Sequence, residues 1–129
     1  MSGFPRSRRC FPGATRPMCI FCKIVNEEIP AAVVYSDDDV IAFRDLHPKA
    51  PLHVLIIPRR HISSVNDVEA DDAAVLGRLF VAARAVAESE GVAKSGYRLV
   101  MNTGSHAGQT VDHIHLHILA GRAMSWPPG

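Results

Sequence analysis

The sequence predicts one domain of the α/β class, of the α+β type, with several short strands, one long helix and one short helix. Three observations support this prediction. The 129 residues are 47% hydrophobic and 21% charged, which is ordinary for a globular domain that buries a core. Several runs rich in β-branched residues, bounded by Pro, Gly or Asp, indicate strands. One longer stretch repeats its apolar residues at the spacing of a helix.

Residues 1–17 are interpreted as a disordered extension that precedes a domain spanning 18–129. This segment has four Arg, no acidic residue and no hydrophobic period. An Arg-rich, acid-free start is typical of a mitochondrial transit peptide, although the Pro and Gly residues here oppose an amphipathic helix. Met18 as the true or an alternative start is favoured over a passive tail, and organellar targeting ranks third.

Composition argues against several classes of protein. The net charge of +1 does not suggest nucleic-acid binding, and no apolar run approaches the ~18 residues of a membrane span. Three cysteines are too few for a disulfide scaffold, and the odd number suits a reducing compartment. No secretory signal is present. A cytoplasmic protein is therefore predicted.

Cys19–Val25 is predicted to form the short helix, with Ile20, Phe21 and Ile24 on one apolar face. Cys19 and the second cysteine of the C-x-x-C pair lie one turn apart, a spacing that can chelate a metal. Because the chain has no second such pair, zinc would need histidine as its other ligands. The alternatives are two partly buried thiols without metal and, less favoured because no strand precedes it, a redox pair.

The segments Val33–Tyr35 and Val40–Phe43 are predicted to form a hairpin around the acidic turn at 36–39. Asp45 comes soon after the second strand. It is therefore placed at the end of a strand, where a carboxylate can reach a pocket.

The next two elements are the most β-like run and the longest helical pattern of the chain. Leu52–Ile57 is predicted as a strand that carries His53 and is closed by Pro58. Asp67–Glu90 is predicted as the long helix, because acids crowd its start and apolar residues recur along one face. Gly91 is expected to end this helix in a left-handed conformation.

Three of the seven histidines alternate with apolar residues in the stretch His113–Leu119. On a strand, His113, His115 and His117 would share one face, whereas on a helix they would scatter. A strand is therefore predicted, following another at Tyr97–Asn102. The connecting loop contains two Gly residues, which allow backbone N–H groups to approach an anion, so it is a candidate phosphate-binding loop.

Three aligned imidazoles suit two kinds of chemistry. A neutral imidazole is a nucleophile near pH 7 when one nitrogen is free and the other is held as a donor, and the middle residue, His115, is the natural candidate. Phosphorus is its best target, because neighbouring donors can bind the phosphoryl oxygens. Alternatively, three imidazoles and a water form a catalytic zinc site. The residue pattern alone leaves both hypotheses open.

The histidine stretch resembles the His-x-His-x-His-x-x signature of the histidine triad (HIT) superfamily, in which x is apolar. The resemblance extends to the Hint branch, the histidine triad nucleotide-binding proteins, and covers the chain from Cys19 to the C-terminus. It also rests on Cys19-Ile-Phe-Cys-Lys-Ile, Ile29-Pro-Ala, Phe43-Arg-Asp45, Ala50-Pro-Leu-His53, Ile57-Pro58, His61-Ile62, Gly96-Tyr-Arg, Asn102, Gly108-Gln109 and Trp126-Pro-Pro-Gly129.

This resemblance implies a two-layer HIT-like fold, with an antiparallel sheet of about five strands that continues across a homodimer. It implies hydrolysis of purine nucleoside phosphoramidates and acyl-nucleotides at the α-phosphate, through a nucleotidyl-histidine intermediate, with AMP or GMP bound. One alternative is a dinucleoside polyphosphate hydrolase, which the Trp-Pro-Pro-Gly ending opposes. The other is a nucleotide-binding or scaffold module without catalysis.

By position, the resemblance makes His115 the nucleophile, with His113, His117 and Thr110 as further catalytic residues. Asp45 would bind the ribose hydroxyls, and Trp126 would reach the substrate site of the partner subunit. The other implied substrate contacts are Asn102, Gly108 and Gln109 at the phosphate, Ile20, Phe21, Ile24, Phe43, Leu46 and Leu55 around the base, and His53 beside them.

The resemblance implies that catalysis needs no metal. The C-x-x-C pair resembles that of bacterial members in which two Cys and two His bind a structural zinc. In this chain, the implied ligands are Cys19, Cys22, His53 and His113. The sequence departs from the Hint pattern at Thr110, where Ser is usual, and at Arg59-Arg60, where a Lys pair is common, which puts substrate preference in question.

Overall fold

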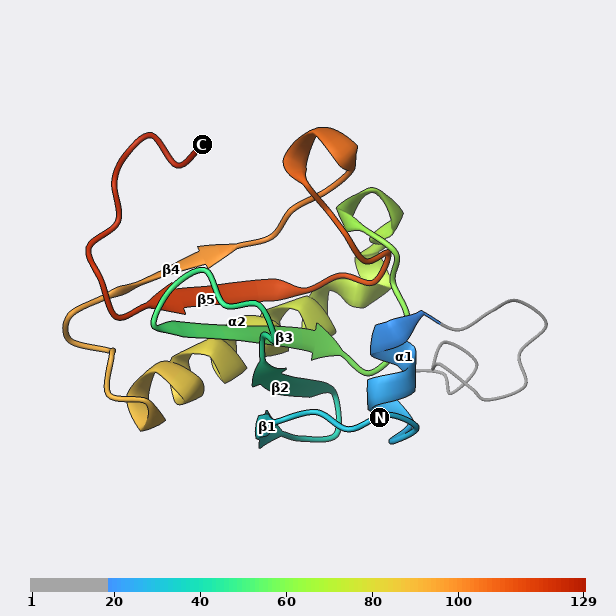
Figure 1. Ribbon diagram of the computed structural model, residues 1–129. Helices are drawn as coiled ribbons and strands as arrows, with labels where there is room; N and C mark the ends of the chain where they lie inside the picture. Colours follow the sequence, from blue (N-terminus) through green and yellow to red (C-terminus); the bar gives the residue numbers. More distant parts are fainter. Residues whose placement is uncertain (1–18) are drawn as a thin grey trace.

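A computed structural model describes residues 19–129, so the predicted extension at 1–17 lies outside the described residues. Figure 1 shows one sheet with the long helix packed across one face and the short helix at one end. The helices and strands are α1 (Ile20–Val25), β1 (Val33–Ser36), β2 (Val40–Arg44), β3 (Leu52–Pro58), α2 (Ala73–Ser89), β4 (Tyr97–Val100) and β5 (Leu116–Ala120). Three single 3-10 turns complete them: η2 (Val65–Asp67), η3 (Ala70–Asp72) and η4 (Ser105–Ala107).

The five strands form one antiparallel sheet in the order β1-β2-β3-β5-β4, which confirms the predicted α+β fold. Strand β3 lies in the centre, between β2 and β5, and all seven of its residues are buried. Strand β4 lies at an edge of the sheet. The homodimer implied by the resemblance stays a prediction.

The two faces of the sheet bury different clusters, because successive side chains on a strand point to opposite sides. On one face, Val54 and Ile56 of β3 pack with α2 residues such as Leu79. On the other face, Leu55 and Ile57 pack with residues of α1 and β2. Both faces of the central strand are therefore covered, which is why β3 is apolar throughout apart from His53 and the closing Pro58.

The long helix is shorter than the sequence predicts. Instead of beginning at Asp67, α2 begins at Ala73, after the separate turns η2 and η3. The backbone of Val68 is extended between these turns, and the side chain of Asp72 accepts a hydrogen bond from the Glu69 N–H. The Glu69 side chain accepts the Asp72 N–H in return, so the two residues cap the turn η3, and regular helix follows only after it. The expected left-handed Gly91 is confirmed, with a φ of 76°.

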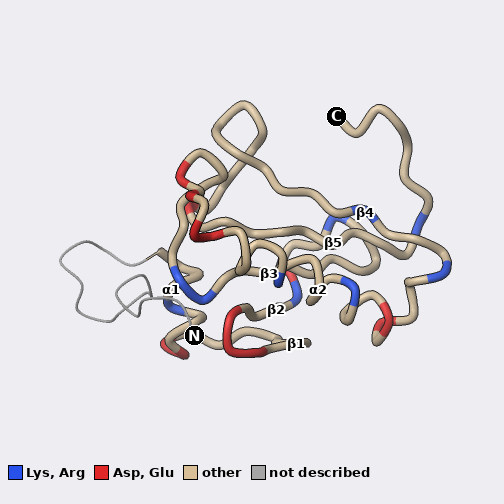
Figure 2. The backbone as a smooth tube through the Cα atoms, turned by 180° about the vertical axis from the view of Figure 1, so that it is seen from behind, with Lys and Arg blue, Asp and Glu red and all other residues tan. Residues whose placement is uncertain are grey.

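Two turns are rich in acidic residues. Figure 2 shows one such group at the β1–β2 turn and another in the segment before α2. In the first of these, a carboxylate oxygen of Asp37 accepts the backbone N–H groups of Asp39 and Val40. These bonds help to hold the pKa of Asp37 below its ordinary value, although burial opposes them. Within residues 19–129, no helix is both long and apolar enough to cross a membrane.

Candidate active site

The histidine stretch enters its strand later than predicted but keeps the predicted alternation. Strand β5 begins only at Leu116, because the Ile114 N–H donates to the carbonyl of Ile62, in the loop after β3, at 2.7 Å. The apolar members Ile114, Leu116 and Ile118 all belong to the core under α2. The histidines therefore face the opposite side of the sheet, toward α1 and the second cluster.

His115 is held in the form that a nucleophile requires. Its side chain is buried, with the residue 4% exposed, and its Nδ1 lies 2.8 Å from the carbonyl oxygen of His113. Because a carbonyl can only accept, Nδ1 carries the proton and Nε2 keeps its lone pair. The ring of Phe21 stands edge-on to His115, with centroids 5.1 Å apart, and fixes the imidazole plane from the side of α1.

His117 forms a pair with His53 across neighbouring strands. The Nε2 of His53 and the Nδ1 of His117 are 2.9 Å apart, and Asp45 brings its Oδ2 to 3.4 Å from the same His53 nitrogen. The pKa of His117 is lowered to about 4, chiefly by burial and in smaller part by the neighbouring His115. Asp45 and His53, predicted as substrate contacts, therefore lie within one hydrogen-bonding group with the last histidine.

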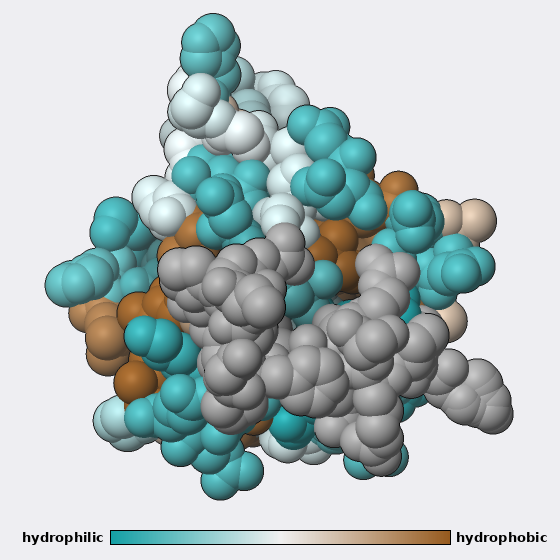
Figure 3. Space-filling view, turned by 90° about the vertical axis from the view of Figure 1, so that its right-hand side faces the viewer, coloured by the Kyte–Doolittle hydropathy of each residue, from teal (hydrophilic) through white to brown (hydrophobic). Residues whose placement is uncertain are grey.

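The residues predicted to surround a base are split between a buried cluster and an exposed rim. Phe21, Ile24, Phe43 and Leu55 pack together in the cluster under α1. Ile20 and Leu46 lie outside it and are 52% and 87% exposed. Figure 3 looks onto the α1 end of the molecule, where hydrophobic areas alternate with hydrophilic ones around the grey atoms.

The glycine loop that precedes the histidines is stabilised by its own glutamine. The side-chain amide of Gln109 donates to the carbonyls of Ser63 and Val111, and its oxygen accepts the Gly104 N–H. Gly108 adopts the left-handed conformation, with a φ of 82°, that this turn requires. The amide of Gln109, predicted to contact phosphate, therefore holds the backbone of the loop in place. The loop leaves Thr110 exposed and Asn102 half-buried.

Trp126, predicted to reach the partner subunit, is 80% exposed on the C-terminal segment. The guanidinium of Arg98 lies 6.0 Å from the centre of its ring. The described chain therefore presents this aromatic residue to solvent, and its reach into another subunit stays a prediction.

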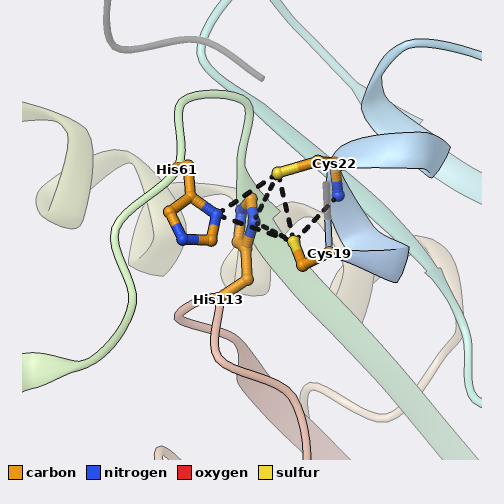
Figure 4. Close-up of side chains that lie close together, drawn as sticks. All are labelled: Cys19, Cys22, His61 and His113. Carbon is orange, nitrogen blue, oxygen red and sulfur yellow. Dashed lines mark hydrogen bonds between the residues drawn. The ribbon is translucent and has the colours of Figure 1, made fainter. Parts of the chain in front are cut away.

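The two cysteines meet two histidines, but one of these is not the predicted one. Figure 4 shows Cys19 and Cys22 from the start of α1 converging with His61 and His113. The four ligand atoms all lie within 4.8 Å of one another. The prediction of His53 in this set is wrong: His53 lies with Asp45 and His117.

The register of the sheet explains the error. In the antiparallel pair β3–β5, His53 lies opposite Leu119 and Ile56 lies opposite Leu116. If this pairing is extended from Leu116 back to His113, the residues opposite are those that follow Pro58, and His61 lies in that segment. The position of His113 at the start of the histidine stretch was the signal that could have identified His61 from the sequence.

The three histidines of the stretch do not form one metal site. The Nδ1 of His113 faces the cysteines, that of His115 donates to a backbone carbonyl, and that of His117 faces His53. Among residues 19–129, neither group with metal-ligand spacing contains all three. The geometry therefore favours the nucleophile hypothesis over a three-histidine catalytic zinc.

Comparison with known proteins agrees with this geometry. The family model for the HIT domain matches residues 26–124. The purine nucleoside phosphoramidase of Escherichia coli K12 is 54% identical over 105 residues, covering 81% of this chain and 88% of the relative. An uncharacterized HIT-like protein of Synechococcus elongatus is 49% identical over 110 residues, covering 85% and 96%.

Solved structures show the same fold. The HIT family hydrolase of Legionella pneumophila Philadelphia 1 superposes with a TM-score of 0.84 at 53% identity, covering 86% of this chain and 99% of that one. A histidine triad protein of Clostridium difficile gives a TM-score of 0.81 at 43% identity, covering 83% and 93%. With the alternating histidines, the antiparallel sheet and these matches in agreement, the chain belongs to the HIT domain family.

Proposed function

We propose that this protein hydrolyses purine nucleoside phosphoramidates and acyl-nucleotides at the α-phosphate, through a nucleotidyl-histidine intermediate. The observation that carries this proposal is the bond from His115 Nδ1 to the His113 carbonyl, because it leaves Nε2 as the nucleophilic atom. The apolar cluster beside it suits a base, and the E. coli relative is named a purine nucleoside phosphoramidase.

The proposed reaction has two displacements at phosphorus. The lone pair of His115 Nε2 forms a bond to the α-phosphorus, the bond from phosphorus to the amine nitrogen or acyl oxygen breaks, and the leaving group departs with that electron pair. An amine leaving group takes its proton from water. The His113 carbonyl stabilises the positive charge that develops on the His115 ring through Nδ1–H. In the second displacement water attacks phosphorus, the bond from phosphorus to His115 Nε2 breaks and its electron pair returns to the ring. The attacking water loses one proton to solvent, the nucleoside monophosphate leaves, and His115 is neutral again.

The test is turnover of adenosine 5′-phosphoramidate by the full chain, followed as release of AMP and ammonia. Diadenosine polyphosphate serves as the competing substrate. Preferred cleavage of the phosphoramidate is the expected result. Preferred cleavage of the polyphosphate would indicate that the protein is a dinucleoside polyphosphate hydrolase. AMP binding without cleavage of either substrate would identify a nucleotide-binding module.

Asp45 is expected to bind the ribose hydroxyls of the substrate. It lies in the loop after β2, its Oδ1 accepts the His47 N–H at 2.7 Å, and each carboxylate oxygen can accept a further hydrogen bond. Asp45→Ala should weaken AMP binding by about 1.5–3 kcal/mol, the range for hydrogen bonds to a charged group. Calorimetric titration with AMP measures the change.

A nucleotide that lacks one ribose hydroxyl provides the control for Asp45. The wild type should bind 2′-deoxy-AMP more weakly than AMP, and this difference should shrink in Asp45→Ala. Asp45→Asn keeps the side-chain size but removes the charge, so its affinity for AMP should lie between those of the wild type and Asp45→Ala. Equal affinity of the wild type for both nucleotides would contradict the assignment.

We also propose a structural zinc ion held by Cys19, Cys22, His61 and His113. Tetrahedral zinc with sulfur and nitrogen ligands separates its ligand atoms by roughly 3.3–3.8 Å. Here the two Sγ atoms are 3.1 Å apart, and the four distances between sulfur and imidazole Nδ1 lie between 3.2 and 3.6 Å.

The outer contacts of the two histidines suit the same ion. His113 donates its Nε2–H to the carbonyl of Pro58, and His61 places its Nε2 3.1 Å from the hydroxyl of Ser63. Both rings can therefore keep an Nδ1 lone pair toward the cysteines, as ligating imidazoles do. When bound, the ion would join α1 to the loop after β3, and a closed set of four protein ligands leaves it no part in the chemistry.

A further inference from the structure

Two neighbouring clefts form a groove between the end of α1 and the β1–β2 hairpin. The larger cleft has a volume of about 540 Å³ and the smaller about 440 Å³. Both are lined by Val25, Ser36 and Arg59, so they are continuous. Among the described residues, neither Asp45 nor any histidine lines either cleft. The groove is therefore separate from the candidate active site.

The floor of the larger cleft is apolar. Ile24, Ile29 and Ile41 line it, and all three belong to or pack against the hydrophobic cluster under α1. Val33 of the edge strand β1 also lines it and is 47% exposed. An apolar cleft beside a sheet edge suits an extended segment that places a large apolar side chain in it.

Acidic residues border the groove at both ends. Glu27 and Glu28 line the larger cleft, and Asp37 and Asp38 line the smaller one. Figure 2 shows these acidic residues after α1 and in the β1–β2 turn. Among the described residues that line the groove, Arg59 is the one basic side chain, and it donates to two oxygens of the hairpin at 2.7 and 2.8 Å. The groove therefore carries negative charge and suits a cationic segment.

One of these acids stands in a strained backbone conformation. Glu27 follows the last turn of α1 with a φ of 60°, in the left-handed region that glycine adopts without penalty. The helix end needs this conformation, because the N–H groups of Glu27 and Glu28 donate to the carbonyls of Ile24 and Lys23. It does not need a carboxylate there. The strain that glycine would avoid indicates a role for the Glu27 charge at the groove.

We propose that the groove binds residues 1–18 of the same chain. That segment lies outside the described residues, but its sequence has four Arg, no acidic residue and two phenylalanines, one of them Phe11. It joins the described chain at Cys19, and α1 runs only ~9 Å from there to Val25 at the groove. The eight residues from Phe11 to the join extend up to ~26 Å, which is long enough to reach the apolar floor.

The bound segment would also stabilise α1. This helix has six residues, too few to be stable without packing. Its residue Ile24 lies both in the groove and in the cluster proposed to bind the base, so a segment in the groove would hold the helix against the sheet. The proposal does not rest on the proposed function, because its tests measure binding and contacts without turnover.

The segment can be tested as a separate peptide, because the rest of the chain corresponds to a complete folded relative. The Legionella hydrolase is covered over 99% of its length by 86% of this chain. A peptide of residues 1–18 carrying Cys10→Ser is titrated into protein that begins at Met18, and methyl NMR follows binding. The tethered segment has an effective concentration of about a millimolar, so we expect a dissociation constant below ~1 mM. Weaker binding, or equal binding of a scrambled peptide, would overturn the proposal.

Variants of the groove separate docking from folding. Glu27→Gly together with Glu28→Gln should weaken the peptide at least ~3-fold, because each exposed ion pair contributes up to about fivefold. The fold should be retained, because glycine suits the φ of 60°, and the melting temperature checks this. Glu88→Gln, which removes an exposed acid of α2, should leave peptide binding unchanged. Equal weakening by Glu88→Gln would show attraction to the overall charge and contradict a specific groove.

The full chain shows whether the segment binds its own groove. Compared with protein that begins at Met18, it should have shifted methyl signals for Ile29 and Ile41 and cross-relaxation between these methyl groups and the ring of Phe11. Phe11→Ser should remove both effects. Shifts confined to the face under α2 would refute the location. Shifts that appear only at high protein concentration would assign the groove to a segment of a second copy and overturn binding within one chain.

Discussion

Replacing His115 with alanine should remove at least ~100-fold of phosphoramidate turnover while leaving AMP affinity nearly unchanged. The large effect is expected because no other described imidazole has the same arrangement. His113 donates its Nε2–H to the Pro58 carbonyl and turns its Nδ1 to the cysteines, and His117 has its Nδ1 facing His53. Steady-state kinetics and calorimetry on the same preparation give the two quantities.

The covalent intermediate provides a second measurement for the same residue. Wild-type protein quenched during turnover should gain the mass of one nucleotidyl group, located on the peptide that contains His115. His115→Gln, which fills the space but offers no ring nitrogen, should show no adduct. A variant that retains the wild-type rate would refute the nucleophile and favour the binding-module hypothesis.

Removing zinc or one of its ligands should lower stability strongly. A ligand present at 100 times its dissociation constant stabilises the fold by about 2.7 kcal/mol, which in a domain of this size is roughly a 10 °C shift in Tm. We expect about one zinc per chain after purification without chelator, and less than about a tenth of that in His61→Ala, because one of four ligands is lost. Elemental analysis and thermal melting test both expectations.

The matched control replaces His53, the histidine that lies outside the proposed zinc site. His53→Gln should retain its zinc, because His53 lies with Asp45 and His117 instead of the cysteines. A wild-type protein that contains no zinc and melts identically with and without a strong chelator would leave the cysteines as packing residues. Loss of turnover by chelated protein that remains folded would instead reopen the metal-dependent mechanism.

The places of the strands along the chain and the two faces of the histidine stretch could be predicted from the sequence. Hydrophobic alternation depends only on the period of a strand, so Ile114, Leu116 and Ile118 were placed in the core from their spacing alone. The start of α2 could not be placed in the same way. The side chain of Asp72 bonds back to Glu69 across η3, so the chain makes a separate 3-10 turn before regular helix begins.

The sequence by itself determined which groups are available: alternating imidazoles on one side of the histidine stretch and a C-x-x-C pair at the start of α1. Only the tertiary structure decided how these groups are divided. The β3–β5 register sends His113 to the cysteines together with His61, and it leaves His53 beside His117. The spacing of residues along the chain fixes the face of a strand, but a ligand set and a tautomer depend on contacts between segments far apart in sequence.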